Sequence, residues 1–146
     1  MLDSPITEAV TLAFAPIFLL TGIGALLNVM THRLGRVVDR ARLIEGLLEE
    51  GEAPDPAARH RQELQSLGAR ITSANRAIVA TSVSALLVCL EVALLFLEQL
   101  MSMSVALVVA GLFIATMVSL TVGLVFFLIE IAVATRSLKI RQELLF

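Results

Sequence analysis

Several ingredients of an ordinary soluble domain are scarce in this sequence. The chain has no tryptophan and no tyrosine, and it has one cysteine, Cys89, among 146 residues. A single cysteine excludes a disulfide within one chain and therefore a disulfide-stapled secreted scaffold. Charged residues make up 16% of the chain and the net charge is −2, which gives no indication of nucleic acid as a partner. We expect none.

Hydrophobic residues are correspondingly abundant. They make up 58% of the chain, whereas average soluble domains are closer to half apolar and about a quarter charged. A chain this short leaves much of its surface exposed, so the surplus cannot be buried in a core. The composition therefore indicates an integral membrane protein, whose direct surroundings are the lipid bilayer.

Three stretches with few or no charges are long enough to cross a bilayer. They are residues 9–31, residues 77–97 with Glu91 as the one charge, and residues 99–129. About 20 apolar residues in a helix span the hydrocarbon layer. The sequence predicts an all-α integral membrane protein with three transmembrane helices and a short turn near Met101–Ser104. The predicted parts are an outer segment with the first span (1–31), a helical hairpin (32–76), spans two and three (77–135) and a tail (136–146).

The basic residues indicate an orientation. All 11 Lys and Arg lie between Arg33 and Arg76 or between Arg136 and Arg141. The positive-inside rule predicts that both segments are cytoplasmic, with the N-terminus outside and the C-terminus inside. Three spans place both segments on one side, in agreement with the rule. The first apolar window follows acidic residues and no basic one, which is not the pattern of a cleavable signal peptide.

The segment between the first two spans has the pattern of two antiparallel helices. Apolar residues recur at helical spacing from Leu34 to Leu48 and again from Leu64 into the second span. Gly51–Pro56 interrupts the pattern, and we expect Asp55 to cap the second helix with Pro56 in its first turn. This hairpin is either a solvated stalk or a docking element for a cytoplasmic partner, and the alternation of its arginines with acids favours the stalk.

Small residues recur every four positions along two of the spans. The third span has Gly111, Ala115, Ser119 and Gly123, and the second has Ala77, Thr81, Ala85, Cys89 and Ala93. Helices in lipid associate through close packing of small residues. The spacing predicts that these two ridges pack against each other and make spans two and three a tight hairpin.

Glu91 is the ionisable residue expected deepest in the membrane. It lies 15 residues after Arg76, roughly 22 Å along a helix. A carboxylate at that depth is costly unless it is neutral, paired or hydrated, and it is a functional site by default. Two hypotheses stay open: Glu91 handles an ion or proton, or it is a neutral carboxyl that bonds helices together. The candidate path residues are Glu91, Glu98, Ser84, Thr11, Thr21 and Asn28.

Glu130 is expected at a different depth, near the cytoplasmic boundary. Arg33 follows the first span and Arg76 precedes the second, so both should lie at that same boundary. Opposite charges at one depth predict a structural ion-pair cluster of Arg33, Arg76 and Glu130.

Three motifs resemble a known family. They are Thr21-Gly22-Ile23-Gly24-Ala25-Leu26-Leu27, the arginine-rich run from Arg33 to Arg42, and Ala134-Thr135-Arg136-Ser137-Leu138. Together they resemble a family of small bacterial membrane proteins catalogued as domain-of-unknown-function family 2721. The resemblance covers most of the chain and implies a location in the bacterial inner membrane. It implies no activity and no assigned site residues.

The sequence has no motif that points to catalysis. It shows no nucleophile–base set, no phosphate-binding loop and no metal-ligand spacing, so we expect neither enzyme activity nor a cofactor nor a metal. Three helices cannot enclose an aqueous path, so transport would require several copies. The first hypothesis is a homo-oligomeric channel, cation-preferring if Glu91 lines the path. The alternative is a non-conducting scaffold or regulatory subunit whose cytoplasmic hairpin, residues 32–76, binds a partner.

Overall fold

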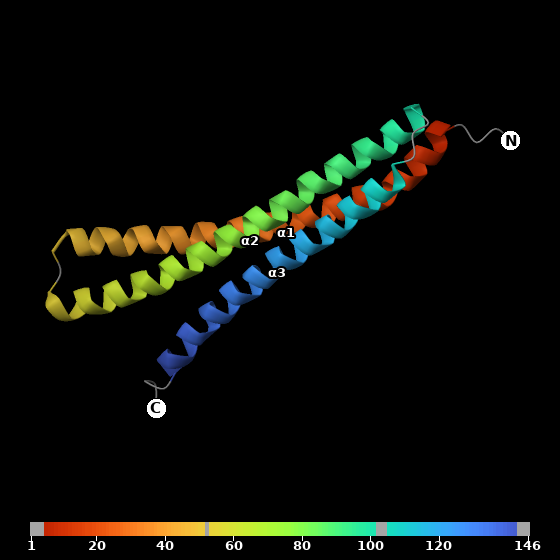
Figure 1. The fold of residues 1–146 in the computed structure, drawn as a ribbon. Coiled ribbons are helices and arrows are strands. Elements are labelled where there is room, and N and C mark those ends of the chain that lie inside the picture. The colour runs from red at the N-terminus through yellow and green to blue at the C-terminus, as the bar shows by residue number, and fades with distance from the viewer. Residues whose placement is uncertain (1–4, 52, 102–104, 143–146) are drawn as a thin grey trace. The chain divides into compact units, whose positions relative to one another are not determined.

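The computed structural model describes residues 5–51, 53–101 and 105–142, which form three long helices (Figure 1). These are α1 (Pro5–Glu49), α2 (Pro54–Met101) and α3 (Ala106–Gln142). The described residues contain no strand, so the prediction of an all-α protein is confirmed. Each helix is long and apolar enough to cross a membrane, as the hydropathy of the sequence predicts.

Two of the three helices continue well beyond the apolar windows. The first window and the following amphipathic segment form one helix, α1, and the second amphipathic segment runs without a break into the second window in α2. This arrangement was predicted from the unbroken helical spacing. Residues 102–104, which hold most of the predicted turn before α3, lie outside the described residues.

The connection between α1 and α2 is short and turns on a glycine. Gly51 has a φ of 82°, a left-handed conformation that side chains with a Cβ rarely adopt. The prediction for the start of α2 was wrong: the helix begins at Pro54, and the amide of Ala57 donates to the carbonyl of Ala53 at 3.1 Å. Asp55 therefore lies inside the first turn. Its charge is favourable at the positive end of the helix dipole, but it is not the cap.

The chain divides into two compact units, and every helix contributes to both. The first unit contains the described residues up to Asn28 together with Val79–Gly123. The second contains Val29–Ile78 together with the described residues from Leu124 onward.

The second unit has an apolar core between the two arms of the hairpin. Val37, Ala41 and Ile44 of α1 pack with Leu67 of α2, and Leu48, Leu64 and Ile71 surround them. Ile44 is completely buried. These side chains recur at three, four and seven residues along each arm, which is the spacing of helices packed side by side with a slight left-handed twist. The amphipathic pattern of residues 34–48 thus corresponds to a helix whose apolar side packs against the other arm of the hairpin.

The first unit buries mostly small or polar side chains, with Ile23 and Val88 as larger apolar ones. Ala13 of α1, Thr81, Ser84 and Val88 of α2, and Thr116 of α3 are all buried. The Ser119 hydroxyl of α3 donates to the carbonyl of Ala80 in α2 at 2.8 Å, which joins the two helices directly. Close approach through small residues and hydrogen bonds between helices are the interactions that hold helices together in lipid.

The predicted four-residue packing ridges are buried only in part. Ala77, Thr81 and Gly123 are buried and Ala85 and Ser119 are half-buried, whereas Gly111, Ala115, Cys89 and Ala93 are exposed. The buried positions of α2 instead follow seven-residue steps, at 67, 74, 81 and 88 and at 77, 84 and 91. Four residues turn a helix by about 40° beyond a full turn, whereas seven fall only about 20° short of two turns. A four-residue ridge therefore rotates out of a long contact.

Large apolar side chains cover the outside of the first unit. Phe18 is 74%, Leu86 70% and Leu107 88% exposed. Exposed apolar surface on this scale is unfavourable in water but costs nothing against lipid tails. The surface therefore agrees with the composition: this part of the chain is built to be surrounded by a membrane.

Candidate functional site

The second unit brings two arginines and one glutamate together from three helices. Glu130 of α3 is 2% exposed, and its two carboxylate oxygens accept from different partners. Arg33 of α1 donates through Nε (3.2 Å) and Nη2 (3.0 Å) to Oε2. Arg70 of α2 donates through Nε (3.2 Å) and Nη2 (2.8 Å) to Oε1. We call Arg33, Arg70 and Glu130 the ion-pair cluster.

The cluster satisfies the buried carboxylate completely. Each oxygen of Glu130 accepts two hydrogen bonds from a charged donor, and such bonds are roughly twice as strong as neutral ones. The side chains of Arg33 and Arg70 are 30% and 19% exposed, so both remain partly accessible to solvent. One negative charge faces two positive charges, which leaves the cluster with an excess of one positive charge.

One member of the predicted boundary cluster has a different partner. Arg76 does not pair with Glu130; its guanidinium lies over the ring of Phe126 at 5.8 Å. The second arginine that pairs with Glu130 is Arg70, which was not among the residues predicted for this cluster. Six residues separate the two along α2, and that spacing places them about 120° apart around the helix. Arg33, which was predicted, also lies 5.6 Å over the ring of Phe127.

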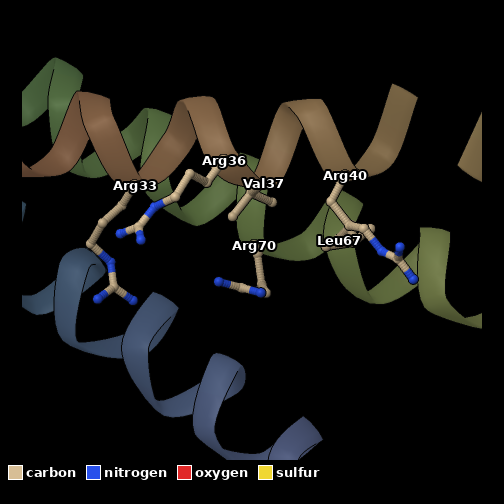
Figure 2. A pocket seen from close by; sticks show the side chains of 6 residues that line it. All are labelled: Arg33, Arg36, Val37, Arg40, Leu67 and Arg70. Carbon is tan, nitrogen blue, oxygen red and sulfur yellow. The ribbon is translucent and has the colours of Figure 1, made fainter. Parts of the chain in front are cut away.

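An arginine-lined cleft adjoins the ion-pair cluster (Figure 2). The cleft has a volume of about 300 Å³, and its lining residues are Arg33, Arg36, Val37, Arg40, Leu67 and Arg70. Arg40 makes a separate pair with Glu63 of α2, with Nε–Oε1 2.9 Å and Nη2–Oε2 3.2 Å. This partner raises the pKa of Arg40 above its ordinary value, so the guanidinium stays charged at every physiological pH.

The predicted ion-path residues do not share one face. Glu91 and Ser84 are buried in the first unit, and the Ser84 hydroxyl donates to the carbonyl of Thr81 at 2.7 Å. Thr11 and Thr21 are exposed on α1, and their hydroxyls donate back to the carbonyls four residues earlier. Asn28 is exposed as well. Within one chain the candidate path residues are thus divided between buried and exposed positions, and their role in a path stays a prediction.

Glu91 and Glu98, the two carboxylates predicted for the path, differ in their surroundings. Glu91 is 4% exposed, and its Oε2 has no hydrogen-bond partner within the described part of the chain. Glu98 accepts from the backbone amide of Val105 at 3.4 Å, at the end of α2 nearest the start of α3. Glu98 thus forms a hydrogen bond with the residue that precedes α3. The Oε2 of Glu91, in contrast, is buried without a hydrogen bond, among the described residues, that would compensate for its loss of water.

The position of Arg70 is explained by the contact line of α2, which the structure reveals. Arg70 lies on the same seven-residue line of α2 as Ala77, Ser84 and Glu91, and all three of these are buried. A charged residue on a core-facing line is expected to have a partner inside the protein. Among the described residues, no group of three or more His, Cys, Asp or Glu is arranged to hold a metal ion.

Comparisons with known proteins agree with the resemblance found in the sequence. A family model described as "Protein of unknown function (DUF2721)" matches residues 13–140, which is most of the chain. No curated protein and no solved structure matched the chain.

Proposed function

The chain belongs to the DUF2721 family, whose function is unknown, and from its geometry we propose that it is a non-conducting membrane scaffold or regulatory subunit. In this proposal the helices anchor the chain in a bilayer, and the hairpin formed by residues 32–76 recruits a cytoplasmic protein partner. The protein has no catalytic role and carries no cofactor in this proposal.

The observation that carries the proposal is the independent core of the hairpin. The hairpin arms bury Val37, Ile44 and Leu67 against each other, and they continue directly into the apolar parts of α1 and α2. The ion-pair cluster adds α3 to the base of the same unit. A hairpin with its own core can present a folded binding surface, and interaction sites are favoured by such structural support.

The charge distribution supports the proposed location. Every Lys and Arg lies outside the first unit, and the exposed sides of the hairpin include Arg42 and Arg59. We place the hairpin and the C-terminus in the cytoplasm, the N-terminus outside, and the chain in the inner membrane of a bacterium. An apolar side chain, Leu43, is 54% exposed on the hairpin and gives a partner a non-polar contact among the charges.

Site-specific photocrosslinking in intact cells tests the proposal. A photoreactive residue at Leu43 or Arg59, both exposed on the hairpin, should give one adduct of the same mass with a protein partner. The matched control is Leu107, which is 88% exposed on the apolar surface of the first unit and should not give that adduct. The same adducts from all three positions, or none from the hairpin, would contradict recruitment by the hairpin.

One observation favours a second candidate, a homo-oligomeric, cation-preferring channel. Glu91 is a buried carboxylate whose Oε2 has no hydrogen-bond partner in the described part of the chain, which is the kind of group that ion and proton paths use. Against it, Glu91 faces the interior of a single chain, where a path between copies would not reach it. We therefore rank this candidate second.

Flux measurements separate the two candidates. Vesicles that contain the purified protein should pass no more cations than empty vesicles when a gradient is applied. If they do conduct, Glu91→Gln should lower the flux or its cation preference, because it removes a fixed charge at nearly constant size. Glu45→Gln, which removes a charge from the exposed surface of the hairpin, is the control. A flux lowered only by Glu91→Gln would replace the scaffold with the channel.

A further inference from the structure

The cleft beside the ion-pair cluster has more positive charge than its partners neutralise. Arg33, Arg36 and Arg40 line the cleft from α1, at steps of three and four residues. Arg70 extends from α2 toward the side of Arg33 and Arg36, whereas the Arg40 side chain turns away from them (Figure 2). Glu130 pairs with Arg33 and Arg70, and Glu63 pairs with Arg40. Four positive and two negative charges leave an excess of two positive charges around a volume of about 300 Å³.

Arg36 contributes one of the two excess positive charges in the cleft. It lines the cleft, its side chain is exposed, and no ion pair or hydrogen bond to it is found among the described residues. In Figure 2 its guanidinium group extends toward the space between Arg33 and Arg70. Among the described residues the cleft therefore holds one guanidinium group whose five N–H donors have no protein acceptor, next to two others that each use two N–H groups on Glu130.

Guanidinium groups in this arrangement match the chemistry of phosphate. A phosphate group has several acceptor oxygens and a negative charge, and the planar fork of arginine binds two oxygens at once. The volume of the cleft is at the lower end of the range for small-molecule sites, which is sufficient for a phosphate group and its immediate substituents. Val37 and Leu67 add an apolar wall for the rest of the ligand.

The position of the cleft along the helices brings it close to the membrane surface. Arg33 comes two residues after the last residue of the first uncharged window, Thr31. Arg40 lies seven residues farther on, a rise of roughly 10 Å. A site at this level is accessible both to phospholipid headgroups and to soluble molecules, and arginines between helices at a membrane boundary bind anionic headgroups in general.

We propose that the cleft lined by Arg33, Arg36, Arg40 and Arg70 binds a phosphate group, either from an anionic phospholipid headgroup or from a soluble phosphate compound. Arg36 supplies the uncompensated charge, and the free N–H groups of Arg33 and Arg70 complete the site without breaking their pairs to Glu130. The proposal does not depend on recruitment of a protein by the hairpin, since it concerns the purified chain alone.

Binding to the full chain in a zwitterionic detergent tests the proposal. The probes are short-chain phosphatidylglycerol, short-chain phosphatidylcholine as the lipid without net charge, and inorganic pyrophosphate. The readout is the ligand-dependent rise in unfolding temperature, from which an apparent affinity follows. Arg36→Gln should weaken binding of the recognised probe about tenfold, because one charge-assisted contact is lost.

Arg42→Gln is the matched control, because it removes the same charge from an exposed position of the same helix outside the cleft. Binding of phosphatidylglycerol that depends on Arg36 but not on Arg42 supports the lipid headgroup as the source. The same dependence seen with pyrophosphate alone supports a soluble phosphate compound. An equal loss in both variants, or no binding of either anionic probe, would overturn the proposal, whatever the crosslinking of the hairpin shows.

Discussion

Glu130 is the residue at which the three helices of the second unit meet. Its carboxylate is buried and accepts four hydrogen bonds from two arginines that remain partly exposed. The net stabilisation from such a pair is modest, because desolvation of the charges opposes their attraction. Removal of one charged partner has a larger cost, because the charge that remains is partly buried without a counter-charge. Loss of one member of the cluster is therefore expected to cost more than the net stabilisation that the intact cluster provides.

We expect Glu130→Gln to lower the free energy of unfolding by about 2 kcal/mol, because two arginines then lose their charged acceptor while staying partly exposed. Chemical unfolding in detergent measures the loss. Arg76→Gln is the control, and it should cost less than about 1 kcal/mol, because Arg76 makes only an exposed contact with the Phe126 ring. In Glu130→Gln combined with Arg70→Gln, the two losses should not add. Strict additivity would show that Glu130 and Arg70 are not coupled.

The sequence allowed part of this cluster to be predicted. Arg33 and Glu130 could be placed at one depth, because each lies at the end of a long uncharged stretch. The choice between Arg70 and Arg76 depends instead on the direction in which each side chain points. That direction follows from the seven-residue contact line of α2, which becomes clear only when the packing of the helices is known.

The buried positions of α2 repeat every seven residues along the helix. Small residues at four-residue spacing are common in apolar helices, and in this chain two of the four on α3, Gly111 and Ala115, are exposed. The buried line of α2 carries different residue types along its length: Leu67 and Ala74 in the hairpin, then Thr81 and Val88 in the apolar part. The same geometry thus continues while the chemistry of the contact changes from apolar packing to small and polar residues.

The hairpin core gives a prediction with a neighbouring control. Ile44→Ala should lower the free energy of unfolding of the hairpin by about 2–4 kcal/mol, because Ile44 is fully buried and its loss leaves a cavity. Hydrogen exchange should then accelerate in residues 37–71 and remain unchanged in the apolar part of α3. Leu43→Ala removes a similar volume from an exposed position and should change stability by less than about 0.5 kcal/mol. Equal effects would mean that the hairpin has no core of its own.

The basic residues of the whole molecule all belong to one of its two units. All 11 Lys and Arg belong to the segments of the second unit, and the first unit has none. The same division was visible in the sequence as uncharged windows and basic segments, which is why the number and order of the helices could be predicted. The sequence alone could not show which residues of each helix are buried, because apolar side chains occur on all sides of a helix in lipid.

This division also leads to a prediction of topology. In a Cys89→Ser background, cysteines introduced at Ala53, between α1 and α2, and at Ala106, at the start of α3, both replace exposed alanines. A membrane-impermeant maleimide applied to intact bacterial cells should label position 106 and not position 53, because basic segments stay on the cytoplasmic side. Labelling of both after the membrane is opened is the control for reactivity. Labelling at 53 in intact cells would reverse the orientation and place the arginine-lined cleft outside the cytoplasm.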